Sequence, residues 1–378
     1  MKFADIVGQQ EIKRRLINSV KDQRVSHAQL FHGAPGSGKM AMALAYAQYI
    51  NCRRRGPDDS CGQCPSCVKY EKLAHPDLHF IFPVTKTSAV QKASSREFLG
   101  TWRNYLIERK AYINLEEWYR QMEVENKQGI INTEDINSIN QTLAYKSFES
   151  EYKVMLIWMV ERIYHAASTR ILKILEEPPD KTLFILISEN PDLIPLTILS
   201  RTQMIRFAPL SDDELTEGLL SRKQIAAADT AKIRFKAGGN LNVALQMAET
   251  GDTDEENFQF FRNWMRLCYV NNFASLYQMS ADFVKLGREK QKSLLRYGLD
   301  IARRCLLMNY KLESKIRSEG EELEFIRKFS DFIHPGNIDT ISAAFDESID
   351  NIERNANGNI LFINLSIKMT MWLRAVRK

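Results

Sequence analysis

The sequence predicts an α/β fold, in which a phosphate-loop core built on a parallel sheet precedes a small helical domain and an all-helical C-terminal part. Three observations predict it: short apolar runs, a glycine-rich loop between one such run and a helix, and the distribution of proline. Ten of the eleven prolines lie at or before Pro209, and only Pro335 follows. Because proline interrupts helices, we expect a loop-rich front and a mainly helical back.

Three nearly continuous apolar runs in the front half are predicted to be strands of a sheet covered on both faces. They span residues 28–31, 154–160 and 182–187. The first run enters the glycine loop of residues 33–39, and the apolar segment 40–46 leaves that loop as a predicted helix. This strand, loop and helix order is the context that a phosphate loop requires.

The predicted core spans residues 1–208 and contains an insertion at about 84–128. This insertion is rich in charged and aromatic residues, and its spacing predicts a pair of helices. After Pro209, the sequence Ser211-Asp212-Asp213-Glu214 is a capping-box pattern that predicts the first helix of a new domain.

We expect this small helical lid domain to span residues 209–250 and a helical collar, or oligomerisation domain, to span 251–378. In the collar, apolar residues recur at helical spacing, and the one strong break falls at residues 334–336. The recurring residues include Phe258, Phe261, Met265 and Cys268.

Composition argues against a disordered chain and against a membrane-spanning one. A hydrophobic fraction of 44% and a charged fraction of 26% are typical of a folded globular chain, and 378 residues predict two or three domains. The net charge of +5 permits contact with DNA without demanding it. Because the chain begins without a long apolar segment and has no run long enough to span a bilayer, we expect a cytoplasmic protein with no membrane partner.

The glycine loop carries Gly33, Gly36, Gly38 and Lys39 at the spacing by which backbone amides and a helix N-terminus bind phosphate. The next residue should be a Ser or Thr that ligates magnesium, but it is Met40. Two interpretations stay open: a loop that binds ATP or ADP, and a tight turn that keeps the shape without a ligand.

The strand at 154–160 ends on the wrong side chains for hydrolysis of ATP. Trp158 and Met159 stand where such enzymes place an Asp for the magnesium shell and a Glu that orients water. Glu161 follows too late to replace that Glu and is expected to be a solvent-facing residue or a salt-bridge partner. Since Met40 removes a further ligand, we expect intrinsic ATPase activity to be lost.

Four of the six cysteines, Cys52, Cys61, Cys64 and Cys67, lie in one turn-rich segment. Four thiolates at this spacing favour a closed, structural zinc site with no open position for water. Cys268 and Cys305 stand alone in helical segments and are expected to be buried apolar residues.

A short match at Leu199-Ser200-Arg201-Thr202 follows the third predicted strand. An arginine at the exposed end of such a core can stabilise the γ-phosphate of a neighbouring subunit. The alternative is an arginine paired with a local carboxylate, which the match alone does not exclude.

Together these motifs resemble the bacterial clamp-loader branch of the AAA+ family. The most specific are residues 172–179, with the sequence Leu-Lys-Ile-Leu-Glu-Glu-Pro-Pro, and the Ser200-Arg201 pair. The resemblance also rests on residues 3–9, Ser26-His27-Ala28, the glycine loop and the four-cysteine segment.

The resemblance implies a non-hydrolysing subunit of the DNA polymerase III clamp loader, in which Arg201 acts in trans and Ser200 positions it. The implied partners are the motor (gamma/tau) and delta subunits, with the sliding clamp reached indirectly and primed DNA bound by the whole complex. Asn242 occupies the position of a phosphate-sensing arginine, and Thr202 that of the family's usual cysteine. The insertion looks like a lineage-specific addition.

Two alternatives compete with this interpretation. An active motor-type ATPase would need the magnesium and water ligands that Met40, Trp158 and Met159 do not supply. A zinc-containing DNA-binding adaptor would explain the cysteines but not the glycine loop, and it would bind DNA in a strongly salt-dependent manner.

Overall fold

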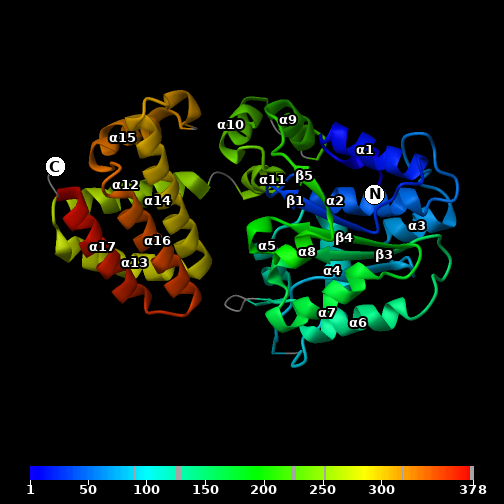
Figure 1. The fold of residues 1–378 in the computed structure, drawn as a ribbon. Coiled ribbons are helices and arrows are strands. Elements are labelled where there is room, and N and C mark those ends of the chain that lie inside the picture. The colour runs from blue at the N-terminus through cyan, green and yellow to red at the C-terminus, as the bar shows by residue number, and fades with distance from the viewer. Residues whose placement is uncertain (89, 125–128, 223–226, 251–252, 317, 375–378) are drawn as a thin grey trace. The chain divides into compact units, whose positions relative to one another are not determined.

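The computed structural model describes residues 1–378 except 89, 125–128, 223–226, 251–252, 317 and 375–378. The chain divides into two compact units, Met1–Gln246 and Met247–Lys378 (Figure 1). The predicted boundaries at residues 209 and 251 stay predictions.

The first unit is built on a parallel sheet whose strand order is β2-β3-β4-β1-β5. The strands are β1 (Ala28–Gly33), β2 (Leu78–Ile81), β3 (Lys153–Trp158), β4 (Thr182–Ser188) and β5 (Gln203–Phe207). The three apolar runs predicted from the sequence are the central strands β3, β4 and β1. In the register between these strands, Lys153 lies opposite Thr182 and Ala28 lies opposite Phe184.

Helices cover both faces of the sheet (Figure 1). On one face, α6 (Thr133–Leu143), α7 (His165–Glu176) and α8 (Leu196–Leu199) contribute to an apolar core with inward side chains of β1, β3 and β4. On the other face lies α2 (Lys39–Ile50), whose twelve residues are all buried, with α1 (Gln10–Lys21) packed against it. The prediction of an α/β core with a doubly covered parallel sheet is confirmed.

The predicted insertion contains two short helices, α4 (Leu99–Glu108) and α5 (Leu115–Gln121), while α3 (Pro65–Glu71) follows the cysteine segment. After β5 the chain forms α9 (Asp212–Leu220), α10 (Ala227–Ala237) and α11 (Leu241–Thr250). The predicted capping box at the start of α9 is confirmed. The Ser211 hydroxyl accepts a hydrogen bond from the Glu214 amide, and the Glu214 carboxylate accepts one from the Ser211 amide.

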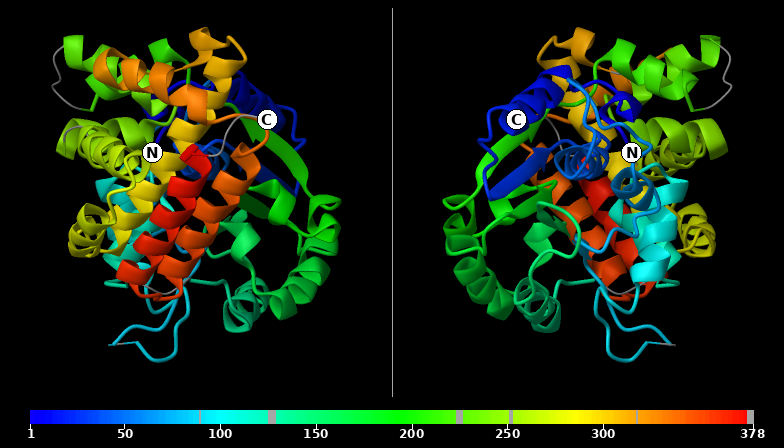
Figure 2. Two further views of the ribbon diagram at one scale, coloured as in Figure 1. Left: turned by 90° about the vertical axis from the view of Figure 1, so that its left-hand side faces the viewer. Right: turned by 90° about the vertical axis from the view of Figure 1, so that its right-hand side faces the viewer.

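The described part of the second unit is helical, as the sequence predicts. Its helices are α12 (Thr253–Tyr269), α13 (Phe273–Lys285), α14 (Arg288–Asn309), α15 (Gly320–Phe329), α16 (Ile338–Glu353) and α17 (Gly358–Arg374). Helices α16 and α17, orange and red in Figure 2, lie side by side. Their common core holds the four recurring apolar residues named above, and Cys268 and Cys305 are fully buried in it. Within the described residues, none of the helices has the length and apolar character needed to cross a membrane.

Candidate functional site

The glycine loop joins the end of β1 to the start of α2, which confirms the predicted strand, loop and helix context. Gly33 and Gly36 have positive φ angles of 134° and 67°. A Cβ on Gly33 would lie 2.1 Å from the carbonyl oxygen of Phe207, and one on Gly36 would lie 2.0 Å from the Asn240 side-chain oxygen. Only glycine fits these two positions without a shift of neighbouring atoms.

Lys39 is turned back onto its own loop. Its ammonium group donates hydrogen bonds to the carbonyl oxygens of Gly33, at 2.9 Å, and Ala34, at 2.6 Å. The side chain is buried, and this burial lowers the pKa of Lys39 to about 8, against the opposing effect of the Glu189 and Glu161 carboxylates. In this arrangement the ammonium group is hydrogen-bonded to carbonyl oxygens of its own loop.

The positions that should hold magnesium and orient water carry only apolar surface. Met40, Trp158 and Met159 are all buried, and the Trp158 ring packs against Trp102 of the insertion with ring centroids 5.0 Å apart. None of these three side chains offers an oxygen ligand, and the predicted loss of ATP hydrolysis stays a prediction.

Glu161 lies where its carboxylate supports a turn. One oxygen accepts hydrogen bonds from the backbone amides of Glu189, at 2.9 Å, and Asn190, at 3.3 Å. The predicted alternative, a solvent-facing or salt-bridged side chain, is therefore replaced by a backbone-capping role. Glu189, which the sequence analysis missed, follows β4 and lines the small pocket beside Lys39, where burial raises the pKa of its carboxyl.

Asn242, at the start of α11, reaches the same pocket. Its side-chain amide donates a hydrogen bond to the Ile113 carbonyl oxygen at 2.8 Å. The structure thus brings Gly36, Gly38, Lys39, Trp158 and Asn242 together around one pocket, whereas Gly33 is not among the residues that line it. It also brings Tyr112 and Ile113 of the insertion into that pocket, which no sequence signal indicated.

Arg201 lies at the surface after α8, beside the C-terminal end of α7. Its guanidinium donates to the Glu176 carboxylate at 2.7 Å, to the Thr197 carbonyl oxygen at 2.8 Å and to the Ser200 hydroxyl at 3.2 Å. The arginine side chain is 34% exposed and that of Glu176 is 46% exposed. Arg201 is thus paired with a local carboxylate, as the alternative in the sequence analysis expected, and it also contacts Ser200. Its action on a neighbouring subunit stays a prediction.

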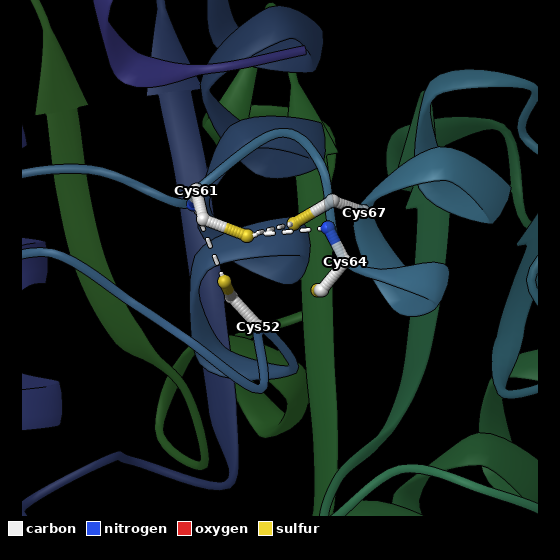
Figure 3. A group of neighbouring side chains, drawn as sticks. All are labelled: Cys52, Cys61, Cys64 and Cys67. Carbon is white, nitrogen blue, oxygen red and sulfur yellow. Dashed lines mark hydrogen bonds between the residues drawn. The ribbon is translucent and has the colours of Figure 1, made fainter.

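The four clustered cysteines converge on one point (Figure 3). Their sulfur atoms all lie within 4.8 Å of one another, and those of Cys61 and Cys67 are 3.9 Å apart. Four sulfurs around a tetrahedral zinc ion, with Zn–S bonds of about 2.3 Å, lie about 3.8 Å from each other. The cluster could hold a metal ion.

Backbone amides support this cluster. The amide of Cys61 donates to the Cys52 sulfur, and the amide of Cys64 donates to the Cys61 sulfur, both at 3.3 Å. The hydrogen bond from the backbone of Gln63 is the main reason why the pKa of the Cys61 thiol falls to about 6. Amide donors of this kind stabilise thiolates, which are the metal-binding form of cysteine.

The cysteine segment is also tied to the N-terminus of the chain. The Asp59 carboxylate accepts hydrogen bonds from the backbone amides of Phe3, at 3.1 Å, and Ala4, at 3.0 Å. Residues 3–6 lead into Val7, whose amide donates a hydrogen bond to the hydroxyl of Tyr112, a residue that lines the pocket beside the glycine loop. The metal-binding candidate and the pocket are therefore linked through one short stretch of backbone.

Comparison with known proteins places these features in a family. The family described as "DNA polymerase III, delta subunit" matches residues 8–211. The tau/gamma subunit of DNA polymerase III from Haemophilus influenzae is 27% identical over 252 residues, which cover 65% of this chain and 30% of that protein. The delta' subunit from Bacillus subtilis is 25% identical over 247 residues, which cover 65% of this chain and 61% of that protein.

The matched region thus spans less than two thirds of these relatives' own length. Among solved structures, a DNA polymerase III gamma subunit-related protein from Thermotoga maritima aligns with 97% of this chain and 99% of its own, at 13% identity and a TM-score of 0.42. Because the family match covers more than half of the 378 residues, the chain belongs to the DNA polymerase III delta subunit family.

Proposed function

We propose that this chain is a delta-prime-type, non-hydrolysing subunit of the DNA polymerase III clamp loader. In this role it helps load the sliding clamp onto primed DNA, beside motor (gamma/tau) and delta subunits. Family membership supports the complex, since the relatives include both tau/gamma and delta' subunits. The observation that carries the non-hydrolysing part is the buried apolar surface of Met40, Trp158 and Met159 where magnesium and water ligands are needed.

Arg201 supports the second part of the proposal, an arginine finger that serves a neighbouring ATPase subunit. Its guanidinium is accessible, and Ser200 and Thr197 hold it at the end of α8. It is not among the described residues that line the chain's own pocket. Its ion pair with Glu176 is solvent-exposed, and such pairs contribute only about 0–1 kcal/mol, so a neighbour's phosphate could compete for the cation.

The alternative is an active motor subunit, and one experiment separates the two. The purified chain is incubated with ATP and magnesium, alone and after assembly with motor and delta subunits, and phosphate release is measured with and without clamp and primed DNA. The proposal predicts no turnover by the chain alone and DNA-stimulated turnover by the assembly only when this chain is present. Sustained turnover by the chain alone would establish the motor interpretation instead.

The cysteine cluster is proposed to hold one structural zinc ion, bound by Cys52, Cys61, Cys64 and Cys67 with no open position. When bound, the metal would supply a cross-link rather than catalysis. Metal analysis should find one zinc per chain, and Cys64→Ser should lose it together with a large part of the thermal stability of the first unit. Cys268→Ser, which alters a buried cysteine outside the cluster, is the control and should keep the metal. Metal-free protein with unchanged stability would exclude the site.

The predicted domain roles are proposed on the same basis. Residues 1–208 would form the AAA+ core, residues 209–250 a lid, and residues 251–378 the collar that holds the complex together. A chain ending at residue 250, studied by limited proteolysis and by co-purification with the other subunits, would test the collar role. The shortened chain should keep its metal but no longer assemble with those subunits.

A further inference from the structure

The pocket beside the glycine loop has almost no free volume. Its cavity measures about 20 Å³, and it lies between the loop, the ends of β3 and β4, the start of α11 and residues 111–113 of the insertion. Pockets that hold small ligands usually measure about 300–1,000 Å³. The space that a nucleotide would require is therefore filled by protein atoms.

Tyr112 contributes a large part of that filling. Its side chain is 3% exposed, and its hydroxyl accepts a hydrogen bond from the Val7 amide at 3.0 Å. A Cβ placed on Gly38 would lie 3.0 Å from the same hydroxyl. The guanidinium carbon of Arg222 lies 4.2 Å from the centroid of the tyrosine ring, which is the geometry of a cation–π contact.

The contacts around the Tyr112 ring resemble those that a protein makes to a bound nucleobase. A flat aromatic ring lies beside a phosphate-type loop, a backbone amide donates to its polar edge, and a cation lies over its face. Tyr112 also connects three segments that are distant in sequence: residue 7 before α1, the glycine loop, and residue 222 after α9. A bound nucleotide would link such segments in the same way.

The backbone on either side of Tyr112 is fixed in place. Lys110 and Ala111 both have positive φ angles, of 46° and 58°, and the Ala111 amide donates to the Leu106 carbonyl oxygen at 2.7 Å, which ends α4 in a tight turn. On the other side, the Ile113 carbonyl oxygen accepts the hydrogen bond from Asn242. The turn between α4 and α5 is thereby held against the pocket from both ends.

The insertion packs on Trp158, the residue that stands in the position of the magnesium-ligating Asp. The ring of Trp102, in α4, packs on Phe82 at 4.2 Å, on Trp118 at 4.9 Å and on Trp158 at 5.0 Å between centroids. The indole N–H of Trp118 donates to the Pro83 carbonyl oxygen at 2.8 Å. An Asp in place of Trp158 would lose the ring contact with Trp102. The Trp158 side chain therefore both removes a magnesium ligand and holds the insertion against the sheet.

We propose that residues 110–113 are a built-in occupant of the nucleotide pocket, with Tyr112 in the space of the base, and that this occupant excludes ATP and ADP. The loop then keeps its shape as a structural joint between the core and the helices that follow β5. This inference concerns the chain by itself, so it holds whether or not Arg201 acts on a neighbouring subunit.

The test uses the full chain and a fluorescent ADP analogue with magnesium. The wild-type chain should show no saturable binding up to about 1 mM nucleotide, whereas Tyr112→Ala should gain binding at least about tenfold tighter than that limit. Adding Lys39→Ala to Tyr112→Ala should remove the gain, which would locate it at the glycine loop. Tyr119→Ala, a change at another tyrosine of the insertion, is the control and should gain nothing.

Two results would overturn the proposal. One is micromolar binding of the analogue to the wild-type chain that Lys39→Ala removes, and the other is a folded Tyr112→Ala chain that still binds nothing. Circular dichroism checks that the variants are folded. If Tyr112→Ala does not fold, hydrogen exchange of the wild-type chain decides: residues 106–113 should keep their protection when about 10 mM ADP is added, and loss of that protection would contradict the proposal.

Discussion

Two cationic side chains of the first unit, Lys39 in the pocket beside the glycine loop and Arg201 at the surface, lie in opposite surroundings. Lys39 is buried and bound to carbonyl oxygens of its own loop. Arg201 is partly exposed and held by an ion pair that is open to solvent. A cation that must act on another molecule has to stay accessible, whereas a cation whose ligand is gone can be satisfied internally. The two surroundings fit the proposed roles, in which Lys39 serves the structure of its own loop and Arg201 acts on a neighbouring subunit.

The largest expected effect is on the assembled complex. Arg201→Ala should reduce the ATPase rate of the complex about a thousandfold, because an arginine finger is typically worth at least that much in turnover. Lys39→Ala in this chain should change the rate less than about twofold, since the proposed function assigns no chemistry to its own pocket. Phosphate release by complexes of equal composition checks both.

The matched control for Arg201 is Arg206→Ala, because Arg206 is an exposed arginine of β5 in the same unit. It should leave the rate unchanged. If Lys39→Ala were the damaging variant and Arg201→Ala the silent one, the roles assigned to the two cations would be reversed.

A second prediction concerns restoring the missing carboxylate. Trp158→Asp should not create ATPase activity, and it should lower the free energy of unfolding by about 3–5 kcal/mol, since it leaves a cavity under Trp102 and buries an unpaired carboxylate. Trp158→Phe keeps an apolar ring and should cost about 1–2 kcal/mol. Urea denaturation followed by circular dichroism measures both. A stable Trp158→Asp chain that turns over ATP would mean that the site was only one residue from activity.

A third prediction uses the depressed pKa of Lys39, about 8 against an ordinary 10.5. Between these values the unfolded chain binds more protons than the folded chain, so the free energy of unfolding should increase with pH as the buried ammonium loses its proton. Its contribution across the whole window is roughly 3 kcal/mol.

Lys39→Met removes this group and is the comparison that isolates it from other residues that titrate above pH 8. Urea denaturation at about pH 8 and pH 10 should show a larger gain for the wild-type chain than for Lys39→Met. Equal pH dependence in the two chains would mean that Lys39 is solvated and that the pocket is open.

Part of the fold could be predicted from the sequence. The central strands β3, β4 and β1 were found because they are buried on both faces and read as continuous apolar runs. The edge strands were missed. Strand β2 has only four residues, and β5 has a mixed pattern in which Gln203, Met204 and Arg206 are exposed.

The losses at Met40, Trp158 and Met159 could also be read from the sequence, because a motif fixes what each position should supply. The entry of Tyr112 into the pocket could not. Periodicity predicts that residues 84–128 form two helices, but it says nothing of where the turn between them lies in space. The sequence also could not identify the carboxylate that pairs with Arg201, because Glu176 and Glu177 are neighbours of the same type. In the structure α7 ends at Glu176, and Glu176 is the residue that pairs with Arg201.

The smallest expected effect sharpens the description of the exposed site. Glu176→Gln removes the charge that pairs with Arg201 but leaves the hydrogen bonds from Arg201 to Thr197 and Ser200. Because the pair is exposed, the free energy of unfolding should fall by less than about 1 kcal/mol. The ATPase rate of the complex should stay within about twofold of wild type, since Ser200 and Thr197 still position the guanidinium.

Glu177→Gln changes the neighbouring exposed carboxylate and should behave like the wild-type chain. A tenfold or greater fall in rate for Glu176→Gln alone would mean that the carboxylate positions the arginine, and the end of α7 would then belong to the trans-acting site.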